Sequence, residues 1–455
     1  MTERRIPFAS HWSVTPIGRV LRPMQHFIHQ SASGGIVLIV ATVIALILAN
    51  TPLSALYEQV RESYIGVSVG PWELRENVLH WINDGLMAVF FFVVGLEIKR
   101  EVMVGELASR RAATLPIVAA IGGVAVPALI YAAFNFGGAG AAGWGVPMAT
   151  DIAFALGIMA LLGDRVPFPL KIFLTAVAIV DDLIAVLVIA FFYSGGINVT
   201  ALAVGILFLG FLMLANINGI RSTLFYAFGG IIIWVAFLQS GVHATIAGVL
   251  IALTIPARYR IDAPTFLERT HRILKRFEQA TTEPDATPML TVETQQTAVI
   301  SLEKACEDVQ APLQKLEHNL HPWVAFAIMP IFALANAGVA LSPEGLDGDT
   351  ISVALGIFLG LVVGKPLGVL GAAWLAVRSG IASLPIGVTW QHMAGAGTLA
   401  GIGFTMSLFI AALGFGEGSE FLDTAKLAIL AASIVAGFLG LILLHRATRG
   451  QPLTD

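Results

Sequence analysis

The sequence has 455 residues, of which 56% are hydrophobic and only 12% are charged, and its formal net charge is −4. Ordinary soluble domains carry about 25% charged residues. The mean hydropathy is +0.82, and a folded chain of this size cannot hide so much apolar surface from water. The composition therefore excludes a soluble enzyme, a nucleic-acid-binding protein and a disordered chain, and the single cysteine excludes an internal disulfide.

Long runs without charged residues predict membrane-spanning helices, because a helix needs about 20 apolar residues to cross a bilayer. The runs do not alternate between apolar and polar residues, as a membrane β-strand would over about 10 residues. Cutting the runs at glycine, proline and asparagine clusters predicts an all-α polytopic membrane protein with about twelve spans. The spans are expected near residues 34–52, 78–98, 114–135, 146–162, 170–193, 200–217, 223–238, 241–256, 322–340, 354–376, 393–414 and 424–445.

The positions of lysine and arginine predict the orientation of these spans. With twelve spans both chain ends lie on one side, and all but four of the 26 lysines and arginines fall on that side. The opposite side carries Arg61 and Arg75, and Lys365 and Lys426 fall within or at the edge of spans. Because cytoplasmic loops are enriched in basic residues, we expect both termini in the cytoplasm.

The predicted organisation alternates membrane and cytoplasmic parts. In chain order these are a cytoplasmic tail at 1–33, spans 1–8 at 34–256, an extended cytoplasmic loop at 257–321, spans 9–12 at 322–446 and a cytoplasmic tail at 447–455. The loop contains a linker, TTEPDATP, followed by helical spacing of apolar residues. The segment SVGPWEL, before the second span, has Gly-Pro turn chemistry that favours a small hairpin on the other side of the membrane.

Five ionisable residues interrupt the apolar spans: Asp84, Asp151, Asp181, Asp182 and Lys365. A charge at mid-bilayer costs at least ~2.5–3.5 kcal/mol on insertion scales. Such residues either face a functional polar site or pair only to hold helices together, and function is the usual reason. We therefore expect a functional site inside the membrane part.

The doublet Asp181–Asp182 lies centrally in the apolar segment LTAVAIVDDLIAVLVIAFF. Two neighbouring carboxylates repel each other, and both are costly to ionise away from water. The pair therefore requires either protons or a cation, and oxygen ligands suit a hard cation. This predicts one site at which protons and a small metal cation compete.

Two spans contain residues that interrupt a helix. In PMATDIAFALG, Pro147 lacks an amide hydrogen, and Thr150 and Asp151 can bond to nearby backbone groups instead of continuing a helix. The break is expected near Thr150–Asp151, in span 4.

The second interruption is expected in span 11, in GTLAGIGFTMSLF, where Gly401 and Gly403 flank Ile402. Such spacing lets an unwound backbone pass close to another, although glycine in a membrane helix more often serves close helix packing. Corresponding breaks in two halves indicate a transporter site at the midplane. Half-helix ends carry partial charges, which Asp151 and Lys365 are suited to neutralise.

Several motifs resemble those of one family: WINDGLMAVFFFVVGLEIKRE, ATDIAFALG, AIVDDLIAVLVIAFFY, SGVHATIAGV, LHPWVAF, FALANAGV, GKPLG and GIGFTMSLFIA. In these motifs, which run in order from about residue 32 to 446, the chain resembles the bacterial NhaA sodium/proton antiporters. The resemblance implies inverted repeats, in which spans 3–5 mirror spans 10–12 and the unwound spans 4 and 11 cross.

The resemblance also implies a function. A protein of this family is a secondary active transporter and not an enzyme, and it exports Na⁺ or Li⁺ electrogenically for a larger number of protons by alternating access. It is pH-regulated, lies in the bacterial inner membrane and serves sodium and pH homeostasis. The implied partners are Na⁺, Li⁺, protons and membrane lipid, with no cofactor and no nucleic acid, and a homodimer is an open option.

The resemblance assigns roles to individual residues. It implies that Asp181 and Asp182 bind the transient Na⁺ with Thr150 nearby, and that Asp151 and Lys365 compensate the helix ends. Lys365 is also implied as a salt-bridge partner of Asp181. The unwound segment of span 11 is Gly401, Ile402 and Gly403. The residues matched to the cytoplasmic funnel and to the pH response are Asp84, Glu97, Lys99, Glu101, Glu317, His318, His321 and His243, and for His243 a satisfied core role is an equal alternative.

The chain departs from the shortest members of the family in its longer N-terminal tail and in its longer segment between spans 8 and 9. That segment joins the face used for pH sensing, so the pH set-point is not implied.

Two other classes of protein fit the aspartate doublet less well. An intramembrane aspartyl protease needs carboxylates from two helices that share a proton, whereas the doublet lies on one helix. A passive channel usually has rings of acids or filter loops from repeated subunits, and broken helices with buried carboxylates fit exchange better.

Overall fold

The computed structural model describes residues 33–69, 72–280, 293–340 and 348–449. The predicted N-terminal tail, apart from its last residue, and the TTEPDATP linker lie outside the described residues. The described chain is helical apart from one β-hairpin, and it divides into two compact units. Among the described residues, unit 1 comprises 33–87, 106–194 and 322–449, and unit 2 comprises 88–105 and 195–321.

Unit 1 contains most of the helices and both strands. Its elements are α2 (Ser33–Ala49), α3 (Ser54–Glu62), β1 (Tyr64–Val69), β2 (Trp72–Asn77), α4 (Val78–His80), η2 (Trp81–Leu86), η3 (Glu106–Ala108), α6 (Arg110–Asn135), η4 (Ala139–Met148), α7 (Ile152–Ala160), η5 (Gly163–Arg165), α8 (Phe168–Phe192), η6 (Val324–Ile328), α15 (Met329–Asn336), α16 (Gly348–Leu359), η7 (Gly360–Gly364), α17 (Lys365–Arg378), α18 (Trp390–Leu399), α19 (Phe404–Phe415) and α20 (Glu420–Ala447). The elements of unit 2 are α5 (Met87–Val104), α9 (Val199–Ile217), α10 (Thr223–Ser240), α11 (Ala244–Thr254), α12 (Ala263–Ala280), α13 (Glu293–Val309) and α14 (Pro312–Trp323).

The helices confirm an all-helical, multi-span membrane protein. Among the described residues, seven helices are long and apolar enough to cross a bilayer, or up to ten if each bent helix pair is one span. Two predicted spans are covered by shorter helices: α11 lies within 241–256, and η6 and α15 lie within 322–340. Every predicted span thus coincides with helical residues, while the count of twelve stays a prediction.

Both predicted helix breaks are present. The pair η4 and α7 is bent by 42° around residues 149–151, and the pair α18 and α19 is bent by 45° around residues 400–403. Three π-helical turns, η2, η6 and η7, were not expected from the sequence. Such turns are rare in proteins, and those that occur often lie at functional sites. The turn η7 directly precedes Lys365.

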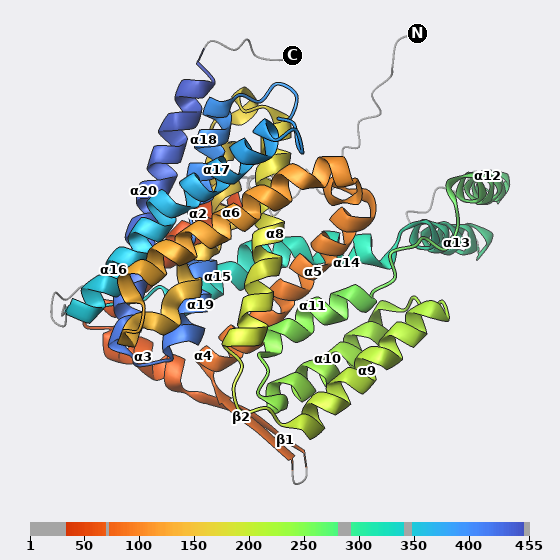
Figure 1. Ribbon diagram of the computed structural model, residues 1–455. Helices are drawn as coiled ribbons and strands as arrows, with labels where there is room; N and C mark the ends of the chain where they lie inside the picture. The colour runs from red at the N-terminus through yellow and green to blue at the C-terminus, as the bar shows by residue number, and fades with distance from the viewer. Residues whose placement is uncertain (1–32, 70–71, 281–292, 341–347, 450–455) are drawn as a thin grey trace. The chain divides into compact units, whose positions relative to one another are not determined.

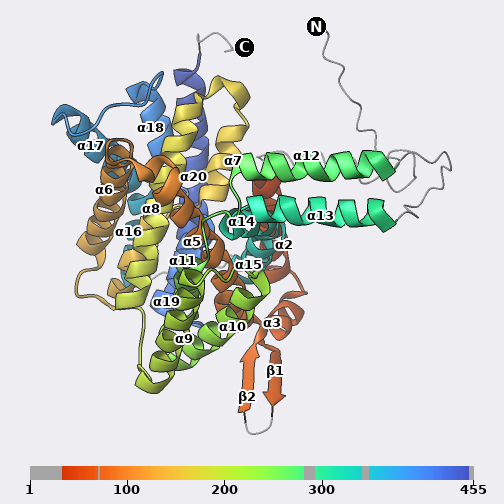
Figure 2. The ribbon, with the colours of Figure 1, turned by 90° about the vertical axis from the view of Figure 1, so that its right-hand side faces the viewer.

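Unit 1 is held together by a close contact between α6 and α17, which lie side by side in both views (Figures 1 and 2). A Cβ atom on Gly122 would lie 2.4 Å from the carbonyl oxygen of Gly368, so the two backbones approach too closely for a side chain there. Alongside it, the position of a Cβ on Gly123 is 3.6 Å from Cε of Lys365. This packing fixes Lys365 deep inside unit 1.

The β-hairpin predicted before the second span is confirmed. Strands β1 and β2 pair antiparallel from Tyr64↔Asn77 to Val69↔Trp72, and residues 70–71 at the turn lie outside the described residues. The hairpin lies at the opposite end of unit 1 from the C-terminal end of α20 (Figure 1). Helix α3, just before it, is tied to α15 because the Tyr57 hydroxyl donates to the Leu334 carbonyl at 2.7 Å.

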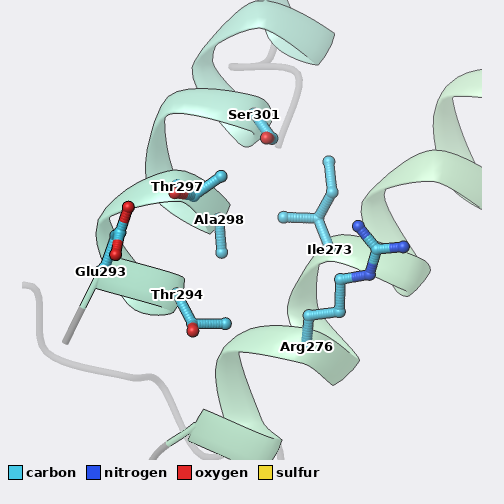
Figure 3. A pocket seen from close by; sticks show the side chains of 7 residues that line it. All are labelled: Ile273, Arg276, Glu293, Thr294, Thr297, Ala298 and Ser301. Atoms are coloured by element: carbon cyan, nitrogen blue, oxygen red, sulfur yellow. The ribbon is translucent and has the colours of Figure 1, made fainter.

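In unit 2 the extended loop forms a helical hairpin, in which α12 and α13 lie side by side (Figure 2). The amides of Arg260 and Ile261 donate to the Asp308 carbonyl at 2.9 and 3.2 Å, so the two ends of the hairpin meet. The cleft between the helices has a volume of about 260 Å³ and contains none of the predicted site residues (Figure 3). It is lined by Ile273, Arg276, Glu293, Thr294, Thr297, Ala298 and Ser301.

Candidate functional site

The aspartate doublet lies in the middle of α8, which continues without a break on both sides. Asp181 is 1% exposed and Asp182 is 2% exposed. The Thr150 hydroxyl donates to Asp181 Oδ2 at 2.8 Å, and Lys365 Nζ donates to the same oxygen at 2.6 Å. Three segments that are distant in the sequence therefore converge on one carboxylate.

Lys365 is wholly buried at the first residue of α17. Besides Asp181, its ammonium donates to the carbonyl of Met148, the last residue of η4. A buried ion pair is tolerated only when its geometry is good and further hydrogen bonds satisfy the charges. A cation at this place also offsets the partial negative charge at the C-terminal end of η4.

Asp151 lies at the starts of two helices. Its Oδ1 accepts the Phe154 amide at 3.0 Å and so caps α7. Its Oδ2 accepts both the amide of Thr405, at 3.2 Å, and the hydroxyl of Thr405, in the first turn of α19. One carboxylate thus satisfies free N–H groups at two positively charged helix ends.

The two helix breaks contact each other through their backbones. The Asp151 amide donates to the Ile402 carbonyl at 2.7 Å, and the Ala400 carbonyl oxygen, 2.9 Å from Thr150 Oγ1, is the alternative acceptor for the hydroxyl proton that Asp181 Oδ2 accepts. A Cβ on Gly401 would lie 2.4 Å from the Leu361 carbonyl oxygen, so only glycine fits there. The predicted unwound segment from Gly401 to Gly403 therefore lies against the helix break at Thr150–Asp151.

One oxygen of the Asp181 carboxylate has no hydrogen-bond partner among the described residues. Asp181 Oδ1 is buried, and it forms no hydrogen bond within the part of the chain that the structure describes. Buried polar atoms are normally bonded, so a proton or a cation would satisfy it. The described residues contain no group of three or more His, Cys, Asp or Glu side chains that could hold a metal ion.

Comparison with known proteins decides the family. The profile of the family described as Na⁺/H⁺ antiporter 1 matches residues 25–444. The chain belongs to the Na⁺/H⁺ antiporter 1 family. This confirms the resemblance drawn from the motifs.

Relatives within the Na⁺/H⁺ antiporter 1 family match almost the whole chain. The Na⁺/H⁺ antiporter NhaA of Oleidesulfovibrio alaskensis is 53% identical over 437 residues, which cover 96% of each chain. The Na⁺/H⁺ antiporter NhaA of Koribacter versatilis is 48% identical over 433 residues, or 95% of this chain and 93% of the relative. With 96% of both chains matched to the first relative, the long 257–321 segment is not peculiar to this chain.

In unit 2 of this antiporter-family chain, four of the residues matched to the pH response gather around Arg100. We call Glu97, Arg100, Glu101, Glu317 and His321 the Glu317 cluster. Arg100 donates to Glu317 and, at 2.9 Å, to Glu101, and His321 Nδ1 lies 3.6 Å from Glu97 Oε1. Arg100 was missed from the sequence, although it stands beside Glu101 in the motif GLEIKRE.

Two groups of the Glu317 cluster have shifted pKa values. Burial raises the pKa of the Glu317 carboxyl, and the guanidinium of Arg100 opposes this shift. The interaction with Glu97 raises the pKa of His321, while burial opposes it. Both groups therefore hold a proton to a higher pH than they would in water.

The structure does not bring the remaining matched residues into the Glu317 cluster. His318 is exposed, and His243 directly precedes α11. Lys99 donates to the Leu253 carbonyl at 2.6 Å and to the Ile255 carbonyl, so it caps the end of α11.

Asp84, which the sequence analysis grouped with the cytoplasmic funnel, lies in η2 near the start of its span. Thirteen residues, or about 20 Å of helix, separate it from Glu97 further along the same span. His80 Nε2 is 2.9 Å from Asp84 Oδ2. Val78, the first residue of the span, directly follows β2, and Asp84 lies six residues after it.

Proposed function

We propose that this protein is an electrogenic Na⁺/H⁺ antiporter that also accepts Li⁺. It exports sodium in exchange for a larger number of protons and so contributes to sodium and pH homeostasis. The observation that carries this proposal is the buried carboxylate of Asp181, which is bonded to Thr150 and Lys365 where two interrupted helices touch. The names of the relatives supply the two transported ions, Na⁺ and H⁺.

In this proposal Asp181 and Asp182 bind either one Na⁺ or protons, with the Thr150 hydroxyl as a neutral ligand. The support is chemical, because hard cations prefer oxygen ligands and two adjacent buried carboxylates cannot both stay ionised at low cost. Competition for one site couples the two ions. Alternating access follows from movement of the interrupted helices around a fixed midplane site.

Asp151 and Lys365 are proposed to compensate the helix ends. The carboxylate of Asp151 touches the starts of α7 and α19, and the ammonium of Lys365 touches the end of η4. Each charge stands beside the helix end of opposite sign. Without them, the amides of Phe154 and Thr405 and the carbonyl of Met148 would lose these partners inside the membrane.

The number of protons can exceed the number of Na⁺ ions in two ways. Either both Asp181 and Asp182 are protonated in the return state, or Asp182 and Lys365 carry the protons while Asp181 stays ionised. The pair of Lys365 and Asp181 at 2.6 Å suits the second route, because Na⁺ and the ammonium would compete for the same oxygen. Coupled groups titrate together, so mutants must separate the two routes.

The remaining proposals concern regulation and location. The Glu317 cluster is proposed as the pH-responsive part, since two of its groups have shifted pKa values. We place the protein in the bacterial inner membrane with both termini in the cytoplasm, in contact with lipid, and we retain a homodimer as an option. An aspartyl protease is disfavoured, because both aspartates of the doublet project from α8.

The test uses everted membrane vesicles that carry a pH gradient. When the parent protein is present, addition of Na⁺ or Li⁺ should dissipate the pH gradient. The measurement is repeated over a range of pH. Asp182→Asn, which keeps the shape of the side chain and removes its charge, should abolish the dissipation of the pH gradient while the protein still accumulates in the membrane. Normal exchange by Asp182→Asn would refute the site.

A further inference from the structure

A second polar cavity lies at the β-hairpin end of unit 1. It has a volume of about 450 Å³, and none of its lining residues belongs to the site around Asp181. Its walls come from the end of α2, from α3, from the start of the span that contains η2, from the end of α15, from the end of α19, from the start of α20 and from the turn between α19 and α20.

Carboxylates outnumber cations around this cavity. Glu58, Glu62, Glu417 and Asp423 line it, and the only cationic side chains among its described lining residues are Arg61 and Lys426. Arg61 is committed to Glu58, whose two oxygens accept from the guanidinium at 2.6 and 2.7 Å. Glu62 and Glu417 form no ion pair or hydrogen bond within the described ranges. A cavity with this balance of charge attracts cations.

Lys426 is the exception among these charged side chains, because it is buried. It projects from α20 and is only 5% exposed. Its nearest carboxylate oxygen is Asp423 Oδ1, at 3.8 Å, and it makes no hydrogen bond to any residue that the structure describes. An ammonium has three donors to satisfy. Lys426 is therefore a cation fixed to the protein, in a cavity whose net negative charge attracts free cations.

The cavity shares one helix, α19, with the site around Asp181. Its inner wall includes Asn83 and Asn336, whose amides are joined at 2.8 Å, and Asn83 directly precedes Asp84. It also includes Ala412 of α19, the helix whose first turn bonds Asp151 through Thr405. Two turns of helix, about 10 Å, separate Thr405 from Ala412.

We propose that this cavity is a vestibule for the transported cation on the β-hairpin side, and that Lys426 competes with Na⁺ for its carboxylates. The inference rests on the proposed function. The tethered ammonium lowers the affinity of the vestibule for Na⁺, so an ion that arrives from the site is released instead of being retained. Lys426 is thus a positioning residue that acts through the electrostatics of the exit.

The expected effect follows from the charge. A unit charge about 6 Å from the bound cation, at an effective dielectric constant of about 40, changes the affinity about tenfold. Lys426→Gln removes the charge, so the half-saturating Na⁺ concentration on the β-hairpin side should fall about tenfold. Lys426→Arg keeps the charge and should behave as the parent does.

The test measures exchange of external Na⁺ for trapped radioactive sodium, with the full-length protein, in right-side-out and in everted vesicles. Lys426→Gln should lower the half-saturating Na⁺ concentration in right-side-out vesicles only. Lys304→Gln, a matched change at an exposed lysine of α13, should alter neither value. A structural defect would change the maximal rate or both half-saturation values together.

An unchanged value in right-side-out vesicles, or an equal shift in both kinds of vesicle, would overturn the inference. Should Lys426→Gln fail to fold, the double variant of the exposed Glu62→Gln and Glu417→Gln replaces it. Removing these two carboxylates should raise the half-saturating concentration severalfold in right-side-out vesicles only, and no change would again overturn the inference. A parent protein that exchanges no Na⁺ in either kind of vesicle would instead refute the proposed function.

Discussion

The ion pair between Lys365 and Asp181 permits a quantitative test, because both side chains are wholly buried and 2.6 Å apart. Lys365→Gln leaves the Asp181 carboxylate without its cation and removes a donor from the Met148 carbonyl. Breaking a buried pair by removing one partner costs about 3–5 kcal/mol, since the remaining charge is uncompensated. We expect the free energy of unfolding to fall by about this amount.

A double-mutant cycle separates the interaction energy of the Lys365–Asp181 pair from the other effects of each substitution on the free energy of unfolding. Replacing both charges, in Lys365→Gln with Asp181→Asn, removes the uncompensated carboxylate, so the double variant should be more stable than Lys365→Gln alone. The assay is equilibrium unfolding of the purified protein in detergent, with Lys304→Gln as the matched control. A loss below about 1 kcal/mol for Lys365→Gln, or costs that simply add in the double variant, would refute the reasoning.

Three further outcomes are expected. Thr150→Ala should raise the half-saturating Na⁺ concentration severalfold without abolishing exchange, because it removes one neutral ligand, as measured in everted vesicles. Replacing residues 263–307 by a short Gly-Ser linker should leave exchange intact and at most shift its pH profile, because the ends of the α12–α13 hairpin meet at Asp308. His321→Gln should shift the activation profile to lower pH, because it removes a protonated group that the cluster retains as the pH rises. The interaction with Glu97 raises the pKa of His321, so the stabilising contribution of the protonated imidazole is present at low pH and is lost as the pH rises through the raised pKa.

Each expectation has an outcome that contradicts it. Parental Na⁺ dependence of Thr150→Ala would remove that hydroxyl from the site. Complete loss of exchange by a folded deletion variant would show that the hairpin takes part in transport. An activation profile that moves to higher pH in His321→Gln would contradict the predicted direction of the shift. The control is Lys315→Gln, which removes an ion pair to Glu307 outside the cluster.

The sequence predicted those features of the site that depend on a residue and its neighbours in the chain. A charge in an apolar run marked Asp181 and Lys365, and residues that interrupt helices marked the breaks at Thr150 and Gly401. These features depend on residue type and on neighbours in the chain. The structure adds the contacts between distant segments, such as the bond from the Asp151 amide to the Ile402 carbonyl.

Features that depend on packing could not be predicted in the same way. The π-helical turn η7 reads as an ordinary apolar segment, and the close packing of its two end glycines is visible only in three dimensions: a Cβ on Gly360 would lie 2.7 Å from Pro147, and a Cβ on Gly364 would lie 3.0 Å from Pro127. Likewise, nothing beside Thr405 in the sequence indicates that it donates to Asp151. Tertiary contacts decide such positions.

The position of Asp84 shows how far a match by motif can be extended. The motif WINDGLMAVFFFVVGLEIKRE holds both Asp84, which is matched to the cytoplasmic funnel, and Glu97, which is matched to the pH response. The motif is one continuous helical span, and its two acids lie about 20 Å apart along it. A shared motif therefore does not place two residues in one site.

The central claim is that Na⁺ and more than one proton compete at the aspartate doublet. Its most direct test is the current that a Na⁺ concentration jump evokes from proteoliposomes on a solid-supported membrane, for the parent and for Asp182→Asn. The account predicts a transient current from the parent, because each cycle moves net charge, and none from the folded Asp182→Asn protein. Exchange by the parent without any current, or a parental current from Asp182→Asn, would contradict it.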